Sequence, residues 1–387
     1  MSATVKRALP RPERDPRIDV LRGAALLMIF ADHIPFNVLS YVTLHNFALC
    51  DAAEVFVLLA GISAALAYGT AVDRGGGVSA IRRIAGRCRQ IYLAQVGLFL
   101  ATLAIGQIWN HHFNLPTTIF APIVQAPVKG VLLSFMLAAQ PDYLNILPLY
   151  IALLAFFPII WLALGRRVEL ALLVSACVWL VSQWVPGVNL PNWTTHDGWY
   201  FDPFAWQFLF TIGVVMARLL VLNGGNLPWH PALAGAAAAF LLFTLPQTAA
   251  WQNLGFPIPW SFALDASDKT HLAWPRLLSV VALAYLVFAS GRVRALAGSS
   301  MFRSMQRCGR HSLEVFATGC VFALFGRLLF RITDHGVTMQ LLVNVAGIAA
   351  MVGVAWWMDS KRGSVGNRNA TGGRGAAPDH RAWQLAR

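Results

Sequence analysis

Runs of apolar residues long enough to cross a lipid bilayer follow one another along most of this chain. The hydrocarbon core of a bilayer takes a helix of about 20 mostly apolar residues. Ten segments meet or approach that length, and we predict a membrane-spanning helix in each. They are residues 18–40, 52–72, 90–109, 143–164, 168–185, 203–222, 231–246, 271–290, 311–331 and 337–358. The pattern therefore predicts an all-α, polytopic membrane protein with about ten transmembrane helices.

The predicted spans form one transmembrane domain over residues 18–358. Residues 1–17 are polar and rich in Pro and Arg, without the apolar run and cleavage site of a secretory signal, so we expect a cytoplasmic segment. Residues 359–387 are rich in Gly, Arg and Ala and predict a disordered cytoplasmic tail. The apolar stretch Val128 to Ala139 is too short to cross and indicates a re-entrant or interfacial helix.

Composition agrees with a membrane protein. Hydrophobic residues make up 57% of the sequence and charged residues 12%, which excludes a soluble globular domain because so much apolar surface could not be hidden from water. The 30 Lys and Arg residues outnumber the 17 Asp and Glu residues, giving a formal net charge of +13. Most basic residues fall before the first span, in alternate loops and after the last span. This distribution predicts cytoplasmic termini, and it gives no reason to expect a nucleic acid partner.

The loops predicted on the outer side are long and rich in Trp, Asn, Asp and Pro; they cover residues 110–142, 186–202 and 246–270. Two interpretations stay open: an aromatic belt at the membrane interface, or a surface that binds carbohydrate. On this side we select five candidates for contact with an acceptor, each of which could instead anchor a helix at the interface. They are Trp206, Gln207, Asp268, Lys269 and Arg276.

The five cysteines form no CxxC pair and have no metal-ligand spacing with histidine. Most of them lie in apolar segments or beside basic loops. We interpret them as small core residues, and we expect neither a disulfide framework nor a metal site.

Polar residues inside a span are costly, and the first span holds the densest group of them. Its sequence IDVLRGAALLMIFADHIPF contains Asp19, Arg22, Asp32 and His33. Arg22 and His33 are eleven residues apart, which is about 1100° of helical rotation, so they share one face about 16 Å apart along the axis. With the N-terminus inside, Arg22 lies near the cytoplasmic end and His33 toward the outside.

An extended ligand such as an acyl-CoA could lie along this face. Arg22 would hold phosphate at the inner end, because a guanidinium binds phosphate in bidentate geometry. His33 would act as general base beside the thioester. Each residue also has a simpler interpretation: Arg22 as a cation that reaches the membrane interface, and His33 as a hydrogen-bonded core histidine.

The second span opens with CDAAEVFVLLAGIS, in which Asp51 and Glu54 are one helical turn apart. If the first two spans pack as a hairpin, one of these carboxylates could orient the His33 ring and stabilise its charged form. The alternative is that both cap the helix N-terminus, where acidic side chains are favoured. Arg310, beside His311 at the inner side, is a further candidate for contact with a donor phosphate.

These segments resemble the OpgC family of membrane acyltransferases. The runs DVLRGAALLMIFADHIPFN and DAAEVFVLLAG carry the resemblance, and the spacing of Arg22 and His33 is similar to the R-x10-H motif of the wider acyltransferase-3 superfamily. Further similar blocks are PDYLNILPLYI (141–151), FDPFAWQFLFTIG (201–213), SDKTHLAWPRLL (267–278) and GRHSLEVF (309–316). The resemblance covers roughly residues 17–358.

The resemblance implies a ten-span enzyme of the bacterial inner membrane that transfers an acyl group, typically succinyl from succinyl-CoA, to hydroxyls of periplasmic glucans. It implies that Arg22 contacts the donor and that His33 is catalytic. It extends more loosely to Asp19 as a donor contact and to Asp51 and Glu54 beside the base. Acyl-CoA is then a co-substrate, and no bound cofactor is expected.

Two alternatives stay open at this point. An acyltransferase of the same architecture could act on another envelope glycan, such as the sugar of lipid A or an exopolysaccharide. One departure bears on the acceptor: His271 stands in DKTHL where the family pattern has DKTNL. A transporter or flippase could instead use the same buried charges to line a path across the membrane.

Overall fold

The structure, a computed structural model, describes residues 14–69, 72, 76–116, 118–195, 197–248, 264–333 and 336–372, and for residues 362–372 the backbone alone. Within these ranges the chain is helical and forms no strand, so the all-α prediction is confirmed there. The principal helices are α1 (Pro16–Asp32), α2 (Ala52–Ala64), α4 (Gly77–Phe113), α5 (Ala121–Gln125), α6 (Pro127–Phe135), α7 (Ile146–Arg166), α8 (Val168–Trp184), α9 (Pro203–Leu222), α10 (Pro231–Thr244), α12 (Trp274–Ala289), α13 (Gly291–Ala297), α14 (Arg303–Arg310), α15 (Ser312–Ile332) and α16 (Val337–Gly372).

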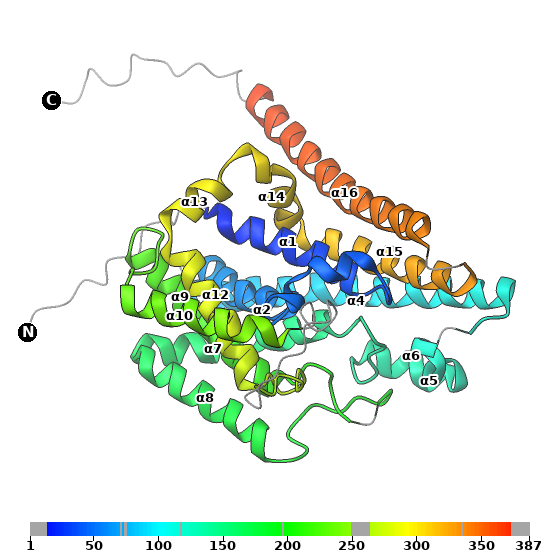
Figure 1. The fold of residues 1–387 in the computed structure, drawn as a ribbon, viewed down its shortest axis with the longest axis horizontal. Helices are drawn as coiled ribbons and strands as arrows, with labels where there is room; N and C mark the ends of the chain where they lie inside the picture. The colour runs from blue at the N-terminus through cyan, green and yellow to red at the C-terminus, as the bar shows by residue number, and fades with distance from the viewer. Residues whose placement is uncertain are drawn as a thin grey trace, which may run out of the picture.

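Helices α1, α4 and α15 run lengthwise through the molecule, with α14 above α1 and with α5 and α6 toward the right-hand end of the view (Figure 1). We call the end where α1 begins the basic end, because Arg14, Arg307 and Arg310 lie there. We call the end where α1 finishes the loop end. Helices α1 and α15 both run from the basic end to the loop end, and α2 returns between these ends.

Both ends of α1 follow from local sequence. Asp15 caps the helix by accepting a hydrogen bond from the Arg17 amide at 3.0 Å, and Pro16 occupies the first turn, where its missing N–H costs nothing. The helix ends at His33 because Pro35 follows and cannot continue it. The span expected over residues 18–40 is therefore shorter than predicted, and two short 3₁₀ segments, Val38–Val42 and Leu44–Asn46, lead toward α2.

Two glycine pairs let neighbouring helices approach at backbone distance. A Cβ atom on Gly61 of α2 would lie 2.1 Å from the Phe210 carbonyl oxygen, and one on Gly213 of α9 would lie 2.3 Å from the Leu58 oxygen. The same holds between α1 and α14, where a Cβ on Gly23 would lie 2.1 Å from the Met305 oxygen and one on Gly309 would meet the Asp19 oxygen. Close backbone contacts of this kind hold helices together where lipid removes the hydrophobic drive for association. They fix α2 and α1, the helices that carry the candidate site.

Six helices in the described residues are long and apolar enough to cross a membrane, so the chain is a multi-pass membrane protein. The number rises to eight if each of two bent pairs, α5 with α6 and α12 with α13, counts as one span. Each of the ten predicted segments coincides with a helix, but α1, α8 and α10 are short. The count of ten and the cytoplasmic position of the termini stay predictions.

Two predicted segments are worth comparing with the structure. The stretch Val128 to Ala139 belongs to the α5 and α6 pair, which bends by 111° as a re-entrant or broken span would. Helix α16 continues through Gly372, so the part of the tail up to that residue is helical, where irregular chain was expected. No proline interrupts residues 337–372, and nothing in the local sequence forces the helix to stop. Residues 1–13 and 373–387 lie outside the described residues.

Candidate active site

Arg22 lies in the basic half of α1 and points between α2 and α14. Its guanidinium donates to the Ser63 hydroxyl, to the Leu59 carbonyl oxygen at 3.4 Å and to the Gly309 carbonyl oxygen at 3.5 Å. All three partners are neutral. The positive charge of Arg22 is therefore held in place without an ion pair to a carboxylate among the described residues.

A polar cavity of about 150 Å³ opens beside Arg22. A second guanidinium, that of Arg87 on α4, also lines it, and this residue was not selected from the sequence. The signal for it is the basic cluster of residues 82–89, which by its position in the sequence indicates topology alone. The other polar residues that line the cavity are Ser63, Tyr68, Tyr150 and Ser312. Two cations and four hydroxyl groups form a suitable environment for phosphate oxygens.

His33 lies at the opposite, loop end of α1, where its backbone N–H closes the helix on the Ile29 carbonyl oxygen. Its half-buried ring contacts Tyr143 edge to face, with ring centroids 4.8 Å apart. Among the described residues no protein group forms a hydrogen bond with the His33 ring.

Asp51 and Glu54 hold each other at the start of α2. The Asp51 side chain accepts from the Ala53 amide at 2.7 Å, and the Glu54 side chain accepts from the Asp51 amide at 2.9 Å, which is a capping box. The capping interpretation of these two residues is therefore confirmed.

The same two carboxylates pair with the two basic residues predicted on the acceptor side. Lys269 Nζ lies 2.5 Å from Asp51 Oδ2, and Arg276 Nε lies 2.6 Å from Glu54 Oε1. Arg276 also reaches Asp51 at 3.1 Å. Burial opposes the charge on Lys269, but the carboxylates outweigh it and the pKa of Lys269 is raised. The four residues form one charged cluster that joins α2 to the segment before α12 and to α12 itself.

This cluster corrects the expected arrangement around His33. Neither Asp51 nor Glu54 hydrogen-bonds the His33 ring in the described part of the chain, because both are already paired with cations. The predicted orientation of His33 by a carboxylate is therefore absent from this structure. Asp51 and Lys269 still lie near enough for their charges to act on the ring.

Asp19 and Arg310, the other predicted donor contacts, lie in an ion network at the basic end. Arg14 Nε lies 2.6 Å from Asp19 Oδ2, while Arg310 lies 3.9 Å from the same oxygen and 3.6 Å from Asp359. Asp19 thus serves to order the arginines of this end. A role for either residue in donor binding stays a prediction.

Trp206 and Gln207 have packing roles, which corrects their selection as acceptor contacts. The Trp206 ring is fully buried, and its Nε1 donates to the carbonyl oxygens of Lys269 and Thr270 at 3.1 Å each. The Gln207 amide donates to the Ser175 carbonyl oxygen at 2.8 Å, which ties α9 to α8. Trp206 therefore supports the loop that carries the charged cluster and presents no face to a sugar.

Asp268 is the predicted acceptor contact that remains accessible. Its carboxylate lies 2.8 Å from His271 Nδ1, and its side chain is 48% exposed. The departure at His271 thus places an imidazole beside the exposed carboxylate.

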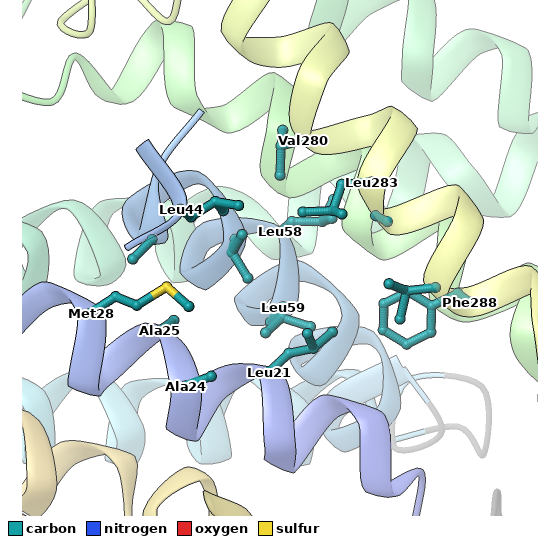
Figure 2. Close-up of a pocket in the computed structure, with 14 residues that line it drawn as sticks. Leu21, Ala24, Ala25, Met28, Leu44, Leu58, Leu59, Val280, Leu283 and Phe288 are labelled. Carbon is teal, nitrogen blue, oxygen red and sulfur yellow. The ribbon is translucent and has the colours of Figure 1, made fainter. Parts of the chain in front are cut away.

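A second cavity, of about 110 Å³, lies on another face of α1 and is lined by apolar side chains alone. Figure 2 shows these side chains converging from α1, α2, α12 and the 3₁₀ segment Leu44–Asn46; the labelled ones are Leu21, Ala24, Ala25, Met28, Leu44, Leu58, Leu59, Val280, Leu283 and Phe288. With no polar group in its wall, this groove can hold only hydrocarbon. It is separate from the face that carries Arg22 and His33.

Tyr143 and Arg327 are the other residues that the sequence did not indicate at this site. The Arg327 guanidinium, on α15, lies over the Tyr143 ring with its Cζ 3.9 Å from the centroid. Tyr143 has a left-handed backbone with φ of 70°, a conformation that bulky residues seldom adopt. An arginine inside a predicted span is the signal that could have identified Arg327.

Among the described residues, no three His, Cys, Asp or Glu side chains cluster as a metal site would require. Residues 14–363 match the family model described as OpgC protein. No curated protein and no solved structure matches the chain. The matched range starts just before α1 and includes every site residue described above.

Proposed function

The chain belongs to the OpgC family, and from that premise we propose that it is an O-acyltransferase of the bacterial inner membrane. The family match indicates a glucan-related membrane acyltransferase. We further propose that the donor is a cytoplasmic acyl-CoA, succinyl-CoA in particular, and that the acceptors are hydroxyls of periplasmic glucans. The same chemistry would also apply to a sugar hydroxyl of another envelope glycan.

The arrangement of α1 supports this proposal most directly. One helix carries the Arg22 cavity toward its basic end and, at its loop end, the His33 ring, which has no hydrogen-bond partner among the described residues. Eleven residues of helix separate them by about 16 Å, which suits a donor whose phosphates and thioester lie at opposite ends of a long arm. Tyr150 of α7 and Ser312 of α15 line the cavity. At the His33 end lie Tyr143, three residues before α7, and Arg327 of α15.

In the proposed reaction His33 accepts the proton of the sugar hydroxyl while the hydroxyl oxygen attacks the thioester carbonyl carbon. The new C–O bond gives a tetrahedral intermediate. That intermediate collapses as the C–S bond breaks, and the CoA thiolate takes the proton back from His33. The products are the O-acyl glucan and free CoA, and no other reactant is required.

The remaining site residues divide between the two substrates. Arg22 and Arg87 hold the donor phosphates at the basic end, with Asp19 and Arg310 near that entrance. Asp268 contacts the acceptor from the loop end. The charged cluster forms the wall of the site next to His33; its members are Asp51, Glu54, Lys269 and Arg276.

The test replaces His33 by alanine in the purified protein, with His112→Ala as the control because His112 is an exposed histidine on α4. Acyl transfer is followed by CoA release and by mass spectrometry of the glucan. We expect His33→Ala to lose at least about 100-fold in turnover while CoA binding and thermal unfolding stay those of the wild type. Unchanged turnover in His33→Ala contradicts the proposal. Movement of labelled glucan across vesicles without any acyl donor would instead establish a transporter.

A further inference from the structure

Arg327 forms no ion pair with a carboxylate in the described part of the chain, and the charge of Asp142 acts on it only from beyond ion-pair distance. It lies in the loop-end half of α15, and two of its three guanidinium nitrogens, Nε and Nη1, are buried and have no hydrogen-bond partner there. A buried guanidinium with unmet donors costs several kcal/mol unless an acceptor is supplied. Such a group indicates an acceptor that the described residues do not provide.

The other cations near the site are satisfied. Arg276 and Lys269 pair with Glu54 and Asp51, and Arg22 donates to three oxygen atoms. Arg327 differs from each of them because it forms no ion pair in the described residues: its charge is met by Tyr143, over whose ring it lies, and at longer range by Asp142. A cation–π contact stabilises the charge but leaves the in-plane N–H groups free to donate.

Arg327, Tyr143 and His33 form one continuous group. The centroid of the Tyr143 ring lies 3.9 Å from Arg327 Cζ and 4.8 Å from the centroid of the His33 ring. Arg327 lies near enough to His33 for its charge to act on the imidazole. Tyr143, which contacts both of the other side chains, has a left-handed backbone. Residues kept in such conformations are concentrated at functional sites.

We propose that Arg327 binds a negatively charged oxygen of the acyl group beside His33 during transfer. This inference rests on the proposed acyltransferase activity. Two oxygens have the required chemistry: the distal carboxylate of a dicarboxylic acyl group, and the oxyanion that develops on the thioester carbonyl. Either one supplies the acceptor that the buried N–H groups lack.

The experiment compares Arg327→Gln with wild type, using succinyl-CoA and butyryl-CoA, which have equal chain length but differ in the distal carboxylate. We expect a loss of about 100-fold or more in kcat/KM. A loss that is confined to succinyl-CoA and appears in KM would show that Arg327 binds the distal carboxylate. An equal loss in kcat with both donors would show that Arg327 binds the oxyanion. Transfer within about two-fold of wild type with both donors overturns the inference.

Two further variants separate this role from folding. Arg331→Gln is the matched control, because Arg331 is an exposed arginine one turn further along α15 and donates to the Pro116 carbonyl oxygen. Arg327→Lys keeps a charge and serves if Arg327→Gln does not fold: it should retain the wild-type unfolding midpoint yet lose at least about tenfold in kcat/KM, since a lysine cannot place the same donors. Wild-type kcat/KM in a folded Arg327→Lys overturns the inference. Absence of transfer by the wild type with every donor would contradict the proposed function itself.

Discussion

The Nε atom of Arg276 lies 2.6 Å from Oε1 of Glu54, and this pair joins α12 to the first turn of α2. The Glu54 side chain is fully buried, so its charge depends on Arg276 for compensation. Removing one partner of a buried ion pair leaves an uncompensated charge, whereas removing both is often tolerated.

We therefore expect Arg276→Met to destabilise the protein by about 3–5 kcal/mol. The double variant with Glu54→Gln should recover a large part of that loss. Unfolding midpoints of the purified protein in detergent measure the effect, with Arg331→Met as the exposed control. A wild-type midpoint for Arg276→Met would mean that Glu54 is not held by this pair.

The Arg22 cavity leads to a prediction about donor affinity. Replacing Arg22 or Arg87 by alanine removes one guanidinium from its wall and should weaken CoA binding about 10- to 100-fold, since hydrogen bonds to charged groups contribute about 1.5–3 kcal/mol. Calorimetric titration with CoA measures this change. Arg83→Ala is the control, because Arg83 is exposed on the same helix one turn from Arg87. Equal affinities in all three variants would place the phosphates elsewhere.

The backbone contact between α2 and α9 predicts a strong effect from one methyl group. Gly61→Ala would place Cβ 2.1 Å from the Phe210 oxygen, which forces the helices apart and should cost about 1–3 kcal/mol. Gly97→Ala in α4 meets no atom within 4 Å and should be neutral or stabilising by up to about 1 kcal/mol. Thermal unfolding of both variants side by side decides the question. A Gly61→Ala protein as stable as Gly97→Ala would contradict the close approach.

Asp202, just before α9, predicts a pH dependence of stability. Its Oδ1 caps the helix by accepting from the Phe204 amide at 2.9 Å, but its Oδ2 is buried without a partner, and burial raises the pKa of Asp202 to about 6. The folded chain thus holds the proton more tightly than the unfolded chain, so this residue's contribution to stability falls as pH rises from about 4 to 6.

Asn is as good a cap as Asp and carries no charge. The free energy of unfolding of Asp202→Asn, relative to that of wild type, should therefore increase as the pH rises. The increase between pH 4.5 and 7.5 should be on the order of 1–3 kcal/mol. Unfolding midpoints of both proteins across that range measure the difference. A constant difference between the two proteins would show that Asp202 does not titrate in this window.

Helix positions were predictable because apolar runs and prolines act locally. The limits of α9, the capping box at Asp51 and Glu54 and the short stretch around Val128 all follow from neighbouring residues. The shared face of Arg22 and His33 follows from helical periodicity alone.

Partners across helices were not predictable in the same way. Periodicity gives the face on which a residue lies but not the helix that packs against that face. Periodicity therefore allows a carboxylate of α2 to orient the His33 ring, whereas in the structure Lys269 and Arg276 neutralise both carboxylates. Trp206 was placed at the surface because a tryptophan at a span end is typical of the interface, but its ring is enclosed by the 269–270 segment.

At the end of α2, Ala65–Gly69 form a π-helical turn, and Tyr68 within this turn lines the polar cavity. Such a turn contains an extra residue compared with an ordinary helix. Deleting a single residue there would restore regular winding and rotate the tyrosine by about 100° relative to the preceding residues. At this point in the chain, natural selection would act on the number of residues more strictly than on their identity, and in-frame deletions should be rarer here than conservative substitutions.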